Sequence, residues 1–191
     1  LHNMDELSRL DIKVNDTVLV KRAGDVIPQI TKVNVDVRDG SETEVNIPNQ
    51  CPSCSTTLKT EGPFMKCDAG MSCPAQLLGY FEHFVSRKAM NIDGLGSKIN
   101  ESLINLGFVS QVADLFKLRQ HESRLKSLEG FGEKSIDNLI ASIESATNPT
   151  LEVFINSLGI PEVGESTAAA LARHFKSFDV LRSATFDELM G

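Results

Sequence analysis

The sequence predicts a multi-domain α+β protein made of three successive parts. Apolar and polar residues alternate with the period of β-strands in residues 1–48. All four cysteines of the chain lie in residues 49–75, whereas residues 76–191 have helical periodicity and repeat a glycine-led segment three times. These observations indicate a partial β barrel, a small four-cysteine ribbon and an all-α domain.

Residues 1–48 are expected to form a short helix and two strands. Asn3 can cap a helix that runs to about Arg9, and strands are predicted at 17–21 and 30–37, with a turn at Arg22–Asp25 between them. Pro28, early in the second strand, suits an edge or a bulge. Because so few strands cannot close a barrel, we expect an exposed sheet edge.

The four cysteines have the spacing Cys-x2-Cys-x12-Cys-x5-Cys, which is typical of a structural zinc site. Their segment has few apolar side chains, and its three prolines together with Pro48 just before it are expected to break regular structure, so a metal has to stabilise it. Two disulfides or four free thiols are the alternatives, and His83 is the one alternative ligand nearby. Four thiolates leave no open position for a catalytic water. The predicted zinc ligands are Cys51, Cys54, Cys67 and Cys73.

The helical part contains an internal repeat. In each copy a glycine opens a helix and a leucine follows seven residues later. Each copy is preceded by a helix-like apolar stretch and a second glycine. The three copies are Gly96–Leu103, Gly132–Leu139 and Gly164–Leu171, and the preceding glycines are Gly94, Gly130 and Gly159. A fourth copy begins in residues 185–191.

These glycine-led turns suit the binding of phosphate. Glycine allows positive φ and close approach of a backbone, and the helix that follows presents free N–H groups to an anion. Lys98 and Lys134 occupy the same position, two residues beyond the turn, in the first two copies. The third copy has Ser166 there, so its turn could serve packing alone. The alternative is that the glycines only turn tight helical hairpins.

The net charge of −7 argues against DNA binding by bulk positive charge. If DNA is the partner, contacts must come from backbone amides, helix N-termini and a few local cations. Three basic pairs could add phosphate contacts or could be solvated surface pairs: Lys21–Arg22, Arg87–Lys88 and Arg173–His174. Lys21–Arg22 is the better candidate for a phosphate contact, because it lies beside a turn.

The residues offer no catalytic constellation, because all four cysteines are assigned to metal and no histidine has an evident partner. No signal peptide and no apolar run long enough to span a membrane is evident, so we expect a cytoplasmic protein. The chain begins with Leu1 and stops in mid-pattern, and we expect both ends to be cut.

Six segments together resemble the C-terminal half of bacterial NAD-dependent DNA ligases. The resemblance covers nearly the whole chain in order and rests on His2–Glu6, Lys21–Pro28, the four cysteines with Pro74–Gln76, His83–Gly96, Leu128–Ser135 and Leu158–Glu165. It implies the end of an oligonucleotide-binding (OB) domain in residues 1–48, a four-cysteine zinc module in 49–75, and tandem helix-hairpin-helix motifs in 76–191, with three copies and a truncated fourth.

The resemblance also implies a function: gripping and encircling nicked duplex DNA for a monomeric enzyme of replication and repair. That enzyme would use NAD and Mg²⁺, neither bound by this segment, and would contain adenylation and BRCT domains absent here. Its Lys-x-Asp-Gly nucleophile is missing, since the nearest match is Asn91–Gly94, so the isolated segment is expected to be inactive. The DNA contacts predicted from the glycine-led turns and the basic pairs are Lys21, Arg22, Arg87, Gly94, Gly96, Lys98, Gly130, Gly132, Lys134, Gly159 and Gly164.

Two other classes of protein remain open at this point. A stand-alone DNA-binding protein with tandem hairpins would explain residues 76–191 but leaves the cysteines and the barrel remnant unassigned. A zinc-stabilised interaction module with hairpins that serve only packing would suit the negative charge.

Overall fold

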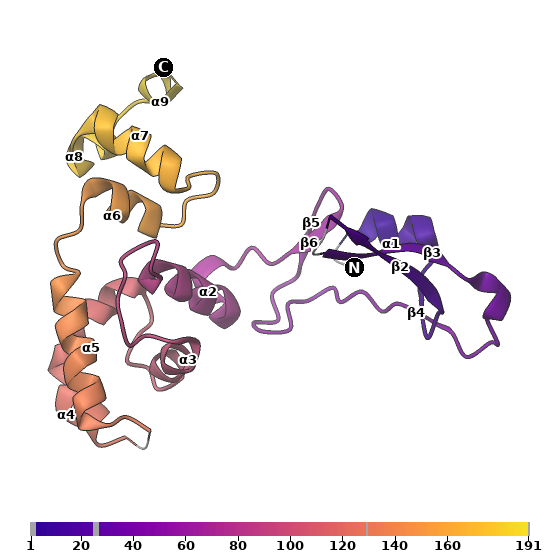
Figure 1. Ribbon diagram of the computed structural model, residues 1–191, viewed down its shortest axis with the longest axis horizontal. Helices are drawn as coiled ribbons and strands as arrows, with labels where there is room; N and C mark the ends of the chain where they lie inside the picture. The colour runs from indigo at the N-terminus through magenta and orange to yellow at the C-terminus, as the bar shows by residue number, and fades with distance from the viewer. Residues whose placement is uncertain (1–2, 25–26, 129, 191) are drawn as a thin grey trace. The chain divides into compact units, whose positions relative to one another are not determined.

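The computed structural model describes residues 3–24, 27–128 and 130–190 (Figure 1). The chain forms two compact units, Leu1–Gly70 and Met71–Gly191. No helix in the described part of the chain combines the length and apolar character needed to cross a membrane. The mixed α and β content, with small open sheets followed by helices, confirms the predicted fold class. The domain boundaries at residues 48 and 75 stay predictions.

The first unit begins with the expected capped helix. Helix α1 (Met4–Leu10) starts after Asn3, whose side chain accepts a hydrogen bond from the Glu6 amide at 3.0 Å. Strand β2 (Val18–Ala23) pairs antiparallel with β3 (Ile27–Val33), and β1 (Lys13–Val14) pairs with β4 (Thr43–Glu44). Among the described residues the sheets are all two-stranded, so the barrel is open as expected.

Two details of the strand prediction are wrong. The second strand ends at Val33 instead of residue 37, and Val35–Val37 form the 3-10 helix η1, because the paired strand β2 begins at Val18 and offers no partner beyond Val33. The first strand runs on through Arg22, which pairs with Pro28, so the turn begins at Gly24 with φ of 59°. Asp25, the predicted end of that turn, lies outside the described residues.

The segment with the cysteines contains a short β-hairpin, which agrees with the predicted ribbon, although the prolines were expected to break regular structure. Strands β5 (Lys59–Glu61) and β6 (Phe64–Lys66) pair antiparallel, and η2 (Gly70–Ser72) is a 3-10 turn. Pro63 is compatible with this hairpin because it lies in the turn after Gly62, where φ is 56°. None of the apolar side chains of β5 and β6 is buried, so the hairpin has no core of its own.

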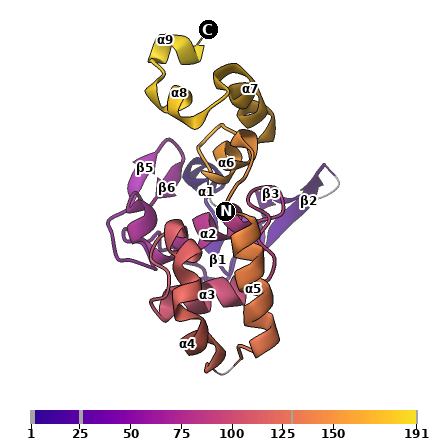
Figure 2. The same ribbon diagram turned by 90° about the vertical axis from the view of Figure 1, so that its left-hand side faces the viewer.

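In its described residues the second unit contains helices and loops but no strand, as predicted. Its elements are α2 (Pro74–Val85), α3 (Ser97–Asn105), η3 (Val112–His121), α4 (Glu122–Lys126), α5 (Glu133–Ser145), α6 (Leu151–Ser157), α7 (Glu165–Phe175), α8 (Phe178–Ser183) and α9 (Phe186–Met190). Figure 2 shows α6 to α9 stacked beyond the group formed by α2 to α5.

One apolar core joins α2 to α5. It contains buried residues from Phe81 in α2 to Ile143 in α5, including the repeat leucines Leu103 and Leu139. In α6 and α7 the buried residues Ile155, Ala168 and Phe175 are separate from this core. The third repeat leucine is only half-buried, so the third copy packs less tightly than the first two.

Candidate metal centre and nucleic-acid interface

The four cysteines lie close enough to hold one metal ion. Their sulfur atoms are all within 4.8 Å of one another, and none of them forms a disulfide. Thiolates about 2.3 Å from a tetrahedral ion are about 3.8 Å apart, and the Cys54 and Cys67 sulfurs are 3.6 Å apart. The donor set and its spacing therefore fit a four-thiolate site, and the disulfide alternative is wrong.

Local backbone structure positions the two ends of this cluster. Cys51 and Thr56 close a tight loop, because the Cys51 amide donates to the Thr56 carbonyl at 2.8 Å and the Ser55 amide donates to the Cys51 carbonyl. Cys73 is 1% exposed and caps helix α2, with Pro74 at its first position. The N-terminus of α2 therefore places its partial positive charge beside Cys73.

Hydrogen bonds and burial act in opposite directions on two of the thiols. The hydroxyl and amide of Thr56 hold the pKa of Cys54 down to about 6. The amide of Ala69 lowers the pKa of Cys67, but burial and the neighbouring thiols of Cys54 and Cys51 outweigh it and raise that pKa to about 11. A bound dication would remove this conflict, since it favours every thiolate at once.

His83, the one alternative ligand, is not part of the cluster. It lies in the last turn of α2, where its Nε2 is 2.8 Å from the Asn156 carbonyl oxygen. Thr56, whose hydroxyl lies 3.3 Å from the Cys54 sulfur, was not identified from the sequence, because the spacing of the cysteines does not single it out.

The glycine-led turns have the predicted backbone geometry. Gly94, Gly130 and Gly159 have φ of 90°, 87° and 60°, which side chains rarely adopt. The second glycine of each turn is the N-cap residue of the next helix: Gly96 for α3, Gly132 for α5 and Gly164 for α7. None of these three caps has a side-chain hydrogen bond, so the first amides of each helix are available to an anion.

The cations predicted to contact DNA are exposed and carry no acidic partner. In the part of the chain that the structure describes, no ion pair involves Lys21, Arg22, Arg87, Lys98 or Lys134. In contrast, Lys117 and Lys126 are paired with acids. An unpaired cation is free to bind a phosphate without first breaking an ion pair.

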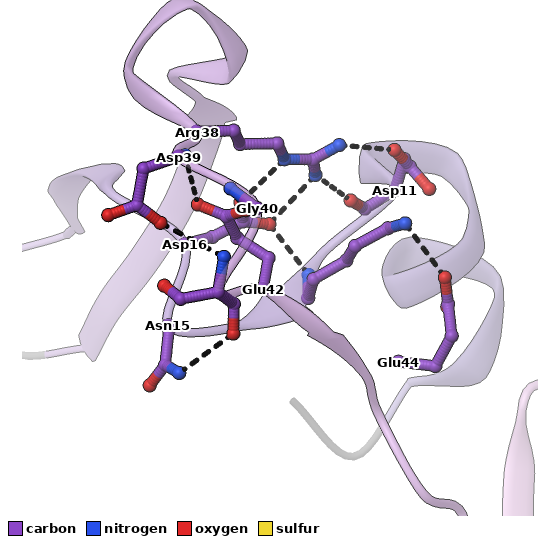
Figure 3. A network of polar contacts seen from close by, with 10 residues as sticks. Asp11, Asn15, Asp16, Arg38, Asp39, Gly40, Glu42 and Glu44 are labelled. Atoms are coloured by element: carbon purple, nitrogen blue, oxygen red, sulfur yellow. Dashed lines mark hydrogen bonds and ion pairs between the residues drawn. The ribbon is translucent and has the colours of Figure 1, made fainter.

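An ionic clip holds the base of the ribbon that carries Lys21 and Arg22 (Figure 3). Arg38, after η1, donates to both carboxylate oxygens of Asp16 at 2.7 and 2.9 Å and to the carboxylate of Asp11 at 3.0 Å. The Asp16 side chain is 1% exposed and also accepts a hydrogen bond from the Lys13 amide. Since Asp16 precedes β2 and Arg38 follows η1, the clip fixes both ends of the ribbon.

Comparison with known proteins gives three matches along the chain. Residues 1–42 match the NAD-dependent DNA ligase OB-fold domain, residues 86–145 the SAM-like helix-hairpin-helix tandem, and residues 153–191 the helix-hairpin-helix motif. The fold and its candidate sites thus define a modular protein with tandem helix-hairpin-helix motifs, the architecture of a DNA-binding region.

Two curated relatives extend the match to nearly the whole sequence. A DNA ligase of Marinomonas sp. (strain MWYL1) is 47% identical over 100% of this chain, and a DNA ligase of Trichlorobacter lovleyi is 47% identical over 99% of it. The chain spans only 29% and 28% of the lengths of these relatives. These matches confirm the resemblance of this chain to the C-terminal part of NAD-dependent DNA ligases.

The clip predicts a pH dependence of the first unit. Hydrogen bonding to Arg38 lowers the pKa of Asp16 below its usual value. The stabilising contribution of Asp16 is therefore complete above the unfolded pKa of about 4 and is lost as the pH falls through the lower folded pKa. Asp16→Asn should lower the melting temperature of the β2–β3 ribbon at pH 7, and this difference should shrink below about pH 4.

Thermal unfolding followed by the amide NMR signals of β2 and β3 at several pH values measures this effect. Asp36→Asn, which changes an exposed acid in η1, is the matched control and should leave the melting temperature nearly unchanged. An Asp16→Asn difference that stays constant down to pH 2 would show that the Asp16 charge does not stabilise the ribbon.

Proposed function

We propose that this chain is the part of an NAD-dependent DNA ligase that grips nicked duplex DNA while other parts of the enzyme seal the strand in replication and repair. The observation that carries the proposal is the recurrence of one structure: a positive-φ glycine, a helix opened by a second glycine and, in two copies, an unpaired lysine two residues on. The matches to DNA ligases support it.

Each hairpin suits a DNA phosphate more than a base edge. The turn offers backbone N–H groups and a helix N-terminus, which bind phosphate oxygens without reading sequence. A nick-sealing enzyme needs such sequence-independent contact, because nicks occur in any sequence. Local backbone donors also reconcile DNA binding with the net charge of −7.

The proposed division of labour gives the chemistry to other parts of the enzyme. Residues 1–191 contain no Lys-x-Asp-Gly segment, and in this assignment the adenylation domain supplies the nucleophile that takes AMP from NAD, with Mg²⁺ as the metal of that reaction. A terminal BRCT domain belongs to the same proposed enzyme, which acts as a cytoplasmic monomer. The residues described above would then bind and position the nicked strand.

We propose zinc as the metal of the four-cysteine site, because four thiolates in tetrahedral reach match its preferred ligands. When bound, zinc supplies structural stability, and full coordination leaves it no open position for a reacting group. Its ligands would be Cys51, Cys54, Cys67 and Cys73. The segment between them buries no apolar side chain besides the cysteines, so its fold depends on the ion.

Removal of the metal should therefore unfold one region selectively. The expected results are one zinc per chain by elemental analysis and, after chelation, loss of the amide NMR dispersion of β5 and β6 while the signals of α3 to α7 persist. Cys51→Ser should reduce the zinc content strongly, and Ser72→Ala, beside Cys73, should not. A chain that contains no stoichiometric zinc, or a hairpin that survives chelation, would contradict the proposal.

The DNA-binding proposal predicts phosphate contacts at the first two hairpins. Lys98→Ala and Lys134→Ala should each weaken binding to nicked duplex and reduce the slope of log affinity against log salt concentration by about 1, because each lysine neutralises one phosphate. Lys117→Ala is the matched control, since that lysine is already paired with Asp114. Unchanged slopes for Lys98→Ala and Lys134→Ala would show that these lysines do not contact DNA phosphates.

A gel-shift titration with nicked and intact duplexes at two salt concentrations separates the proposed function from its alternatives. Preference for the nicked duplex supports a ligase segment. Equal binding to both duplexes would favour the stand-alone DNA-binding class, and absence of binding would favour the protein interaction module.

A further inference from the structure

The third hairpin is joined to the rest of its unit by polar contacts instead of a shared core. The buried residues of α6 and α7 lie outside the apolar core of α2 to α5, and Val153 is the α6 side chain that packs against that core. Phe154 packs instead against Phe178 of α8, with ring centroids 5.2 Å apart. Apolar burial therefore fixes the orientation of the third hairpin only weakly, and directional bonds must supply the rest.

Those directional bonds converge on Asn156, which is 7% exposed in α6. Its side-chain Nδ2 donates to the Lys88 carbonyl at 2.7 Å, and its own carbonyl oxygen lies 2.8 Å from His83 Nε2. A carbonyl can only accept, so this distance requires a proton on Nε2 of His83. The bonds connect residues separated by 68 and 73 positions in the sequence.

The packing around Gly159 brings the third turn against the same helix. A Cβ at Gly159 would lie 3.2 Å from His83 Cδ2 and 3.5 Å from Tyr80 Cε2, so the turn fits closely against the α2 face formed by these two rings. Gly159 also has φ of 60°. The turn and the Asn156 bonds therefore fix the same contact between the third hairpin and α2.

The contact also places a cation beside the third hairpin. Lys88 Nζ lies 3.1 Å from the carboxylate of Glu165, the first residue of α7. The third copy has Ser166 where the other two have Lys98 and Lys134. Lys88, whose backbone carbonyl accepts the Asn156 hydrogen bond, thus forms an ion pair that ties the start of α7 to the segment after α2.

We propose that Asn156 and His83 are positioning residues for DNA binding, which hold the third hairpin at one fixed distance from the first hairpin. Two phosphate-binding turns at a fixed distance can engage one duplex together, because the second contact then costs little additional ordering. This inference rests on the proposed DNA-binding function. Asn156 and His83 set the spacing of the hairpins, and the glycine-led turns bind the phosphates.

A distance measurement on the DNA-free chain tests the positioning directly. Spin labels attached through unnatural amino acids at the exposed positions 101 in α3 and 170 in α7 leave the four cysteines unlabelled. One narrow distance distribution is expected for the otherwise unchanged chain. Asn156→Ala and His83→Ala should broaden it, His83→Gln should restore much of it by keeping a donor, and Asn148→Ala, a control at an exposed asparagine, should not alter it.

The same variants are then titrated with nicked duplex. Asn156→Ala should weaken binding about tenfold and lower the salt slope, because the third hairpin no longer engages together with the first. Helicity measured by circular dichroism identifies any variant that fails to fold. If His83→Ala fails to fold, His83→Gln replaces it in the titration.

The outcomes separate this inference from the function on which it rests. A narrow distribution in Asn156→Ala, or a broad one with unchanged DNA affinity and salt slope, would overturn the positioning role. If the unchanged chain does not bind DNA at all, the proposed function fails, whereas the distance distributions still report whether Asn156 and His83 fix the hairpin.

Discussion

Exposed backbone N–H groups at the starts of helices are the feature on which the rest of the account depends. A chain with net charge −7 repels DNA on average, so any grip must come from donors close to the phosphate. The glycine pairs make such donors available, since one glycine adopts positive φ and the next begins a helix without a side-chain cap. Three copies of a weak local contact can together bind one duplex firmly.

Different forces stabilise the different parts of the chain. Apolar burial fixes the first two hairpins in one core, whereas hydrogen bonds from Asn156 and His83 orient the third. The segment around the cysteines has little apolar burial and depends on four thiolates in reach of one ion. An ionic clip between Arg38 and Asp16 fixes the ribbon that carries Lys21 and Arg22. Each part is therefore sensitive to a different change of conditions.

The sequence was sufficient for features that depend on local chemistry. The helix cap at Asn3, the glycine-led helix starts and the cysteine cluster are confirmed, because each follows from residue type and spacing within a short segment. The prediction failed where the structure of a segment depends on a pairing partner far along the chain. Val35 and Val37 continue the alternation of a strand, but β2 has no residues left to pair with them.

The contacts that position the hairpins could not be predicted for the same reason. Asn156 meets Lys88 and His83 across about 70 residues, and no periodicity in the sequence links them. The clip of Arg38 to Asp16 likewise joins two loops 22 residues apart, and its acid is not distinguishable in sequence from the other acidic residues of this chain. The DNA contacts assigned to individual glycines and lysines stay predictions.

The most direct test of the account is an NMR titration of the ¹⁵N-labelled chain with nicked duplex. We predict that the largest amide shifts fall on the helix starts at Gly96–Lys98 and Gly132–Lys134, with smaller shifts at Gly164–Ser166 and at Lys21–Arg22. Shifts confined to other surfaces, with these turns unchanged at saturation, would contradict the claim that the hairpin backbone holds the phosphates.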